Sequence, residues 1–327
     1  MPMTYKNRKT SLTCLTGLFS LLLFSQEHKD SLRTSEIEEI IAVGKRQKEE
    51  VIPYQKLSGK ELENMNSVSV ADAIRYFSGI QLKDYGGVGG MKTVNIRGMG
   101  SQHVGVFYDG IQLGNAQNGT VDLGKFSLDN MESISLYNGQ KSQIFQSAKD
   151  FGSTGSIYLV SKKPVFNNDK KTNLNFNYRS GSFSLINPSV LWEQKLSENL
   201  SSSLNFEYVN SDGKYKFRQT MKSPNGSIAW DTTAIRNNGA ISAFRAEAGL
   251  FGKINRGKWN LKAYYYDSDR GIPGAIVKNV YHRYEKQWDR NFFVQGSLEK
   301  EITSRYKILV NTKYAYDYTH YLNDDYK

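Results

Sequence analysis

The sequence predicts an α+β domain followed by an antiparallel transmembrane β-barrel, and three observations support this fold class. Residues 57–164 combine two helix-capping patterns with short strands separated by glycines. Residues 165–327 alternate apolar and polar side chains over long stretches without a helical period. The composition joins a negative mean hydropathy to 21 Tyr, 16 Phe and 28 Gly. That balance suits strands with one apolar face and one wet face.

The first 25 residues have the order of a secretory signal peptide. Three cations precede an apolar run from Leu12 to Phe24, and polar residues follow it at once. The run is shorter than the ~20 residues that a membrane-spanning helix needs. Residues 1–25 are therefore expected to be removed on export. Cys14, the only cysteine, would leave with them, so the mature chain would contain neither disulfides nor a thiolate metal site.

Charge and motif content exclude several function classes. The net charge of +11 comes from cations that are interleaved with acids along the chain, which argues against a nucleic-acid partner. The four histidines are far apart and lack metal-ligand spacing. No nucleophile elbow or comparable catalytic frame is present, so the sequence predicts neither an enzyme nor a cofactor or metal site.

Residues 26–56 contain a lone run of β-formers between charge clusters, Ile40 to Val43. No neighbouring segment offers it a packing partner. A short extended segment of this kind can add as a strand to the edge of a partner's sheet, where backbone hydrogen bonds provide the grip. The alternative is an ordinary linker with chance β-propensity.

Residues 57–164 predict a compact α+β domain of about 100 residues, which is enough to bury a core. Ser58 with Glu61 and Ser69 with Asp72 are capping boxes that predict two short helices. Asp109-Gly110 is a hairpin turn between two apolar runs. The expected strands are 80–83, 93–96, the two arms of the hairpin within 103–113, 131–137 and 156–160.

From residue 165 onward the strands become long. Leu174, Phe176 and Tyr178 fall on one face of a strand whose other face carries asparagines and Arg179. This dyad pattern is typical of a transmembrane β-barrel, whereas strands of a soluble sandwich, the alternative, usually have about five or six residues. At roughly 20 residues for each strand and its connection, about eight strands are expected. They begin near residues 173, 184, 201, 215, 240, 258, 290 and 306.

Three stretches resemble the TonB-dependent outer-membrane receptors of Gram-negative bacteria. They are "EEIIAVGKR" (38–46), similar to the TonB box, "VNIRGMGSQHVGVFYDGIQL" (94–113), similar to the family's plug motif, and "MESISLYNGQKSQIFQSAKDFGSTGSIYLVSKK" (131–163), similar to the last plug segment. In the third stretch, Asn138-Gly139-Gln140 and Phe145-Gln146 replace the family's common Arg-Gly-Pro and Tyr-Gly.

The resemblance implies a domain order. Residues 1–25 would be the signal peptide, 26–56 a periplasmic segment, 57–164 the plug, and 165–327 the N-terminal part of a barrel of about 22 strands. The chain ends without a closing strand and is expected to be incomplete. The TonB-binding residues would be Glu39, Ile40, Ile41, Ala42 and Val43.

The plug's apical loops are where the resemblance places the ligand. The expected contacts are Gly87, Gly89, Met91, Gln102, His103, Asn115, Gln117 and Asn118. A plain solvated loop is the alternative for each of them. The Gly-rich run 86–90 is not a phosphate cradle, because no helix with Lys-Ser/Thr follows it. Arg97 would lie in the lumen, where it is expected to form a salt bridge to the barrel wall or to a plug acid.

The implied function is an outer-membrane receptor, surrounded by lipid, that binds a scarce nutrient outside and imports it into the periplasm with a TonB-type partner. A passive porin would need no plug. The stretches 136–159 and 267–277 ("DSDRGIPGAIV") resemble the cobalamin-receptor subgroup of Bacteroidetes. Ferric siderophore or haem is the alternative ligand. A surface lipoprotein is a further partner compatible with the resemblance.

Overall fold

The computed structural model describes residues 54–114, 119–139, 141, 148–167, 170–276 and 283–324. All of them belong to one compact unit, Glu49–Lys327. The predicted signal peptide and the predicted TonB-binding strand, residues 39–43, lie outside the described residues and stay predictions. The same is true of Asn115, Gln117 and Asn118.

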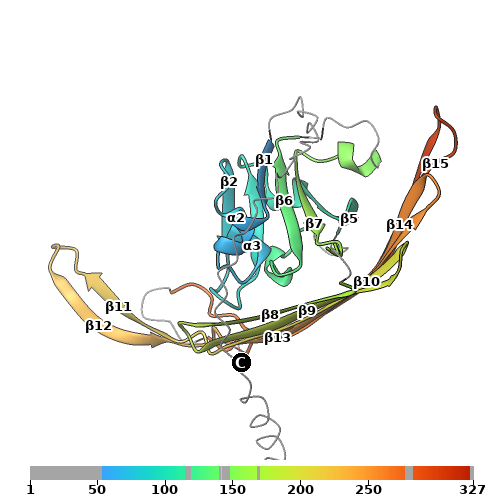
Figure 1. The fold of residues 1–327 in the computed structure, drawn as a ribbon. Helices are drawn as coiled ribbons and strands as arrows, with labels where there is room; N and C mark the ends of the chain where they lie inside the picture. The colour runs from blue at the N-terminus through green and yellow to red at the C-terminus, as the bar shows by residue number, and fades with distance from the viewer. Residues whose placement is uncertain are drawn as a thin grey trace, which may run out of the picture. The chain divides into compact units, whose positions relative to one another are not determined.

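The N-terminal part of the described chain is an α+β domain (Figure 1). A five-stranded sheet has the order β1-β6-β7-β4-β5, in which only the β4–β7 pair is parallel. Strands β2 and β3 form a separate antiparallel hairpin. The elements are β1 Tyr54–Ser58, α2 Lys60–Asn64, α3 Val70–Ile74, β2 Ile80–Asp84, β3 Lys92–Ile96, η1 Ser101–His103, β4 Val104–Tyr108, β5 Ile111–Leu113, η2 Leu123–Lys125, β6 Met131–Tyr137, η3 Ala148–Phe151 and β7 Gly155–Ser161.

Both predicted helices form, and each has five residues. The second has its predicted cap, because the Ser69 N–H and Oγ both donate to the Asp72 carboxylate, at 3.2 and 2.8 Å. In the first, the Glu61 carboxylate accepts the Ser58 N–H at 3.4 Å as predicted, but Ser58 is not the residue that caps the helix. Ser58 ends β1, and Gly59, at φ 52°, is the residue that precedes the helix. Among the described residues, no helix is long and apolar enough to cross a membrane.

The predicted turn at Asp109-Gly110 joins β4 to β5, with φ values of 49° and 83°. Two positive values in succession are what a tight hairpin requires, and Asp and Gly adopt them most readily. The Asp109 carboxylate also accepts a hydrogen bond from the Ser161 N–H at 3.0 Å, which ties the turn to the end of β7. Alternate residues of these strands form the core, including Val106, Ile134, Leu136, Ile157 and Leu159.

The long strands form a seven-stranded antiparallel sheet with the order β16-β15-β14-β13-β10-β9-β8 (Figure 1). We call it the wall. The remaining pair, β11–β12, forms a separate two-stranded hairpin that follows β10 and precedes β13 along the chain. The elements are β8 Thr172–Gly181, β9 Leu185–Ser197, β10 Leu200–Ser211, β11 Tyr215–Lys222, β12 Ile228–Arg236, β13 Ile241–Ile254, β14 Gly257–Gly271, β15 Lys286–Glu301 and β16 Lys307–Leu322. Eight of these were expected, whereas β12 was missed.

The connections at the two ends of the wall's strands differ in length. At one end the strands are joined by residues 198–199, 255–256 and 302–306. At the other end the connections are 182–184, 272–285 and the segment 212–240 that contains the β11–β12 hairpin. We call these the short-turn edge and the long-loop edge. The wall is an open sheet whose outermost strands are β8 and β16.

The faces of the wall follow the predicted alternation. Leu174 and Phe176 of β8 are 70% and 68% exposed on the apolar face. The opposite face has buried polar side chains, among them Asn205, Glu207 and Gln295, and the Gln295 amide donates to the Tyr108 carbonyl of the α+β domain at 3.0 Å. The polar face is therefore the one that holds the α+β domain.

Candidate functional site

Four charged side chains, three of them buried and one partly buried, join the α+β domain to the wall. Arg270 of β14 lies 3.0 Å from Asp122 of the α+β domain and 2.6 Å from Asp289 of β15. Lys125 of the α+β domain lies 3.2 Å from the same Asp289. Each domain supplies one cation and one anion, so neither side leaves an uncompensated buried charge. We call the segment from Asp122 to Lys125 the anchor.

The wall also binds the backbone of the anchor. The Arg245 guanidinium donates to the carbonyl oxygens of Lys125 and Gly124, at 2.8 and 2.7 Å. The Tyr264 hydroxyl donates to the Lys125 carbonyl at 2.5 Å. The anchor is thus fixed by both its side chains and its main chain.

Further contacts lie deeper on the same face. Lys262 and Asp109 form an ion pair at 2.6 Å. Glu247 accepts hydrogen bonds from the Tyr108 hydroxyl at 2.5 Å and from Asn130 at 2.7 Å.

Near β8 and β9, Asp129 of the α+β domain contacts Arg179 and Ser189. Burial raises the pKa of the Asp129 carboxyl, but the hydrogen bonds from Arg179 and Ser189 outweigh burial and leave the pKa below its usual value. These two bonds therefore favour the ionised carboxylate at neutral pH.

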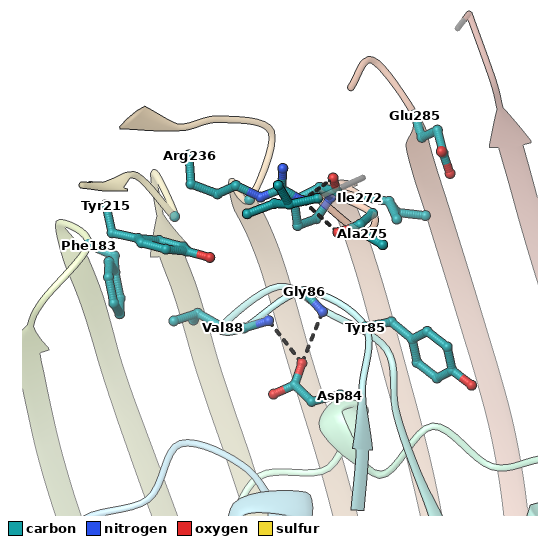
Figure 2. Close-up of a pocket in the computed structure, with 16 residues that line it drawn as sticks. Asp84, Tyr85, Gly86, Val88, Phe183, Tyr215, Arg236, Ile272, Ala275 and Glu285 are labelled. Carbon is teal, nitrogen blue, oxygen red and sulfur yellow. Dashed lines mark hydrogen bonds between the residues drawn. The ribbon is translucent and has the colours of Figure 1, made fainter. Parts of the chain in front are cut away.

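A pocket of about 710 Å³ opens where the Gly-rich loop of the α+β domain meets the long-loop edge of the wall (Figure 2). We call it the outer pocket. Its walls are mainly aromatic and aliphatic side chains and exposed backbone. The lining residues are Asp84, Tyr85, Gly86, Gly87, Val88, Phe183, Gly213, Tyr215, Arg236, Gly239, Ile272, Pro273, Gly274, Ala275, Ile276 and Glu285.

The Gly-rich loop is held from within. The Asp84 carboxylate accepts hydrogen bonds from the N–H groups of Gly86 and Gly87, at 3.0 and 2.8 Å (Figure 2). A Cβ atom on Gly86 would lie 2.8 Å from Cδ of Pro273, so only glycine allows the loop to approach the wall this closely. Position 87 favours glycine for a different reason, because its φ of 71° lies in the left-handed region that other residues rarely adopt.

The wall side of the outer pocket is braced by buried polar groups. Arg236, 2% exposed, donates to the carbonyl oxygens of Pro273 and Gly274. The side-chain amide of Asn238 donates to the carbonyls of Ile272 and Glu285, at 3.0 and 2.8 Å. These bonds fix the 272–276 segment in place.

The predicted ligand residues are not gathered at one rim. Gly87 lines the outer pocket, whereas Gln102 and His103 line a different pocket of about 330 Å³. The two loops are separated by β3, and the role of these residues as ligand contacts stays a prediction. The five residues of β3 span about 16 Å. Gly89, in the same loop as Gly87, lines a third pocket, and the half-buried Met91 lines neither of the first two.

Arg97 is exposed and adopts a left-handed φ of 50°. Within the described part of the chain it forms no ion pair, so its predicted contact with the wall stays a prediction. Charged residues of the wall's polar face, such as Arg245, Lys262 and Arg270, make the contacts instead. The sequence carries a signal for this. Along their strands these cations belong to the polar set that alternates with apolar residues, so they point to the face opposite the apolar one.

The outer pocket offers surfaces that suit the binding of a bulky ligand. Tyr85, Phe183 and Tyr215 are each between 39% and 49% exposed and offer flat faces to a bulky ligand. The loop backbone offers hydrogen-bonding groups at close range. Within the described ranges, no group of three potential metal-ligating side chains is found.

Replacing Gly86 with alanine should destabilise the contact between the loop and the wall. The added methyl would meet the rigid Pro273 ring at 2.8 Å, and overpacking of this kind typically costs about 1–3 kcal/mol. A urea-unfolding series on the folded protein would measure the change. Gly181→Ala is the matched control, because nothing lies within 4 Å of its added Cβ. Equal midpoints for the two variants would contradict the close contact.

Comparisons with known proteins agree with this architecture. Residues 46–152 match the family model described as TonB-dependent Receptor Plug Domain. The siderophore receptor PiuA from Acinetobacter baumannii is similar in structure, with 17% identity, a TM-score of 0.57, and coverage of 83% of this chain and 37% of that one. The ferric-catecholate import receptor Fiu from E. coli K12 is 13% identical with a TM-score of 0.59, and the match covers 83% of this chain and 39% of Fiu. The FrpB iron transporter from Neisseria meningitidis is 11% identical with a TM-score of 0.61, and the match covers 81% of this chain and 41% of FrpB. The chain thus spans less than half the length of these solved structures.

Proposed function

We propose that this chain is the plug and first barrel strands of a TonB-dependent outer-membrane receptor that captures a bulky nutrient outside the cell and imports it. The observation that carries the proposal is the outer pocket, which the Gly-rich loop and the long-loop edge of the wall build together. A ligand bound there touches both the domain that must move and the wall that stays. The match of residues 46–152 to the plug model supports this assignment.

The proposed orientation follows from the connections. In outer-membrane barrels, short turns face the periplasm and longer loops face outward. The long-loop edge, where the outer pocket opens, would therefore face the exterior. The apolar face of the wall, which exposes Leu174 and Phe176, would contact lipid.

Transport would need force from a partner, because a plugged lumen blocks passive diffusion of a bulky ligand. We assign the contact with that partner to residues 39–43, a run of β-forming residues that would add as a strand to the sheet edge of a TonB-type protein. This segment precedes β1, the first strand of the plug.

For the ligand, cobalamin is our first candidate. The stretch 267–277 resembles the cobalamin-receptor subgroup, and its residues 272–276 line the outer pocket. A ferric siderophore is the second candidate, because PiuA and Fiu are described as receptors for siderophores or ferric catecholates. Both ligands are bulky and carry many hydrogen-bonding oxygens.

Titration separates these ligands. The complete gene product should fractionate with the outer membrane, and the purified protein should bind cyanocobalamin saturably when titrated beside haem and a panel of ferric siderophores. Saturable binding of an iron complex alone would move the assignment to the second candidate. Recovery of the protein in the soluble fraction after membrane washing would contradict the receptor proposal itself.

A further inference from the structure

A third, smaller pocket lies behind the Gly-rich loop. Its volume is about 300 Å³, and we call it the inner pocket. It shares four lining residues with the outer pocket, which are Asp84, Gly87, Val88 and Phe183. The tip of the Gly-rich loop therefore separates two adjoining spaces.

Cationic side chains outnumber acidic ones around the inner pocket. The cations are Arg75, Lys92, Arg245 and Arg270, and the acids are Asp72 and Asp84. Both acids and all four cations already have ion-pair or hydrogen-bond partners. Asp72 lies 3.0 Å from the Lys92 ammonium, and Asp84 accepts the loop N–H groups. Arg245 and Arg270 come from the wall, and the other four residues come from the plug.

Arg270 has a donor that nothing on the described chain satisfies. Its NH1 and NH2 groups bind Asp122 and Asp289, and its side chain is 3% exposed. The buried Nε–H meets no acceptor among the described residues. Arg245, which lines the same pocket, is fully engaged, because its NH1 lies 3.0 Å from Glu207 and its other nitrogens donate to the anchor carbonyls. Buried donors in native proteins almost always have a partner, so the unmatched Nε–H of Arg270 points to a ligand.

We propose that the inner pocket is a subsite for an oxyanion carried by the imported ligand, either a phosphate diester or a carboxylate. Guanidinium groups bind such oxyanions by charge-assisted hydrogen bonds, and the volume accommodates one such substituent but not a whole bulky chelate. The proposal rests on the proposed receptor function. It adds that the ligand spans both pockets, with its bulk outside the Gly-rich loop and its oxyanion behind it.

Val209 allows the pocket to be filled without removing a charge. It lines the inner pocket but not the outer one, and it is 2% exposed. Val209→Phe should occupy the space, and Val209→Ile is the matched control. Crystals of the complete gene product grown with selenate should show an anomalous peak beside Nε of Arg270 in the wild type and the isoleucine variant, but not in the phenylalanine variant. No peak in the wild type would overturn the proposal.

A second arm tests the ligand. Cyanocobalamin carries a phosphate diester, whereas dicyanocobinamide lacks it, and ferric siderophores with and without a free carboxylate form the parallel pair. Within whichever pair the wild type binds, Val209→Phe should weaken binding of the ligand that carries the oxyanion by about tenfold. It should leave binding of the ligand without the oxyanion unchanged. Equal effects on both members would overturn the proposal. If no nutrient bound the wild type, the receptor function would fail, and the selenate result would still decide the inner pocket.

Discussion

Replacing Ile41 with proline should stop import while ligand binding to whole cells persists. Proline has no backbone N–H and fixes φ near −65°, so it would remove a hydrogen bond from the proposed pairing of residues 39–43 with a partner's sheet edge. The outer pocket is built by residues 84–285, which the substitution does not touch. Uptake of labelled ligand into the periplasm and equilibrium binding at the cell surface would be measured on the same cells.

Ile41→Val is the control for this change, because valine keeps the backbone donor and the β-propensity. It should import like the wild type. Normal uptake by the proline variant would show that residues 39–43 are a linker, and joint loss of binding and uptake would point to a folding defect.

Replacing Asp122 with alanine should loosen the plug from the wall by about 3–5 kcal/mol. Asp122 is 6% exposed at its side chain and pairs with Arg270 at 3.0 Å. Removing one member of a buried ion pair leaves the other charge without compensation. The Asp122 carboxylate also accepts hydrogen bonds from the N–H groups of Lys92 and Gly124, at 2.9 and 3.0 Å, and both would be lost. The effect would be measured as the urea concentration at which the plug leaves the wall, with the accessibility of an engineered cysteine on β6 as the readout.

The chain offers a matched comparison on its surface. Arg218 and Asp231 form an ion pair at 2.5 Å across the β11–β12 hairpin, with 69% and 34% of their side chains exposed. Exposed pairs contribute little to stability, so Asp231→Ala should leave the release midpoint unchanged. Similar midpoints for both alanine variants would mean that the anchor does not hold the plug.

Local structure was largely predictable from the sequence. The Ser69–Asp72 cap, the Asp109-Gly110 turn and the strands of the α+β domain all follow from short-range chemistry, in which neighbouring residues decide the conformation. The alternation in β8 likewise identified the apolar face, since side chains on a strand point to opposite sides.

The site was less predictable because it depends on distant residues. Gln102 and Gly87 are close in sequence, and only the course of β3 places them in different pockets. The role of Gly86 depends on Pro273, far along the chain. Strand β12 was missed because "IAWDTTAIR" is short and only partly alternating, and its pairing with β11 gives it its structure.

The anchor has a consequence for the order of assembly. Its side-chain and main-chain partners, Arg245, Tyr264, Arg270 and Asp289, come from β13, β14 and β15, three consecutive strands of the wall. Contacts between segments that are close in sequence form faster than distant ones. The plug can therefore dock as soon as these three hairpin-connected strands have paired. Docking at that stage would shield the polar face of the growing sheet from misassociation, which is the characteristic hazard of slow-folding β proteins.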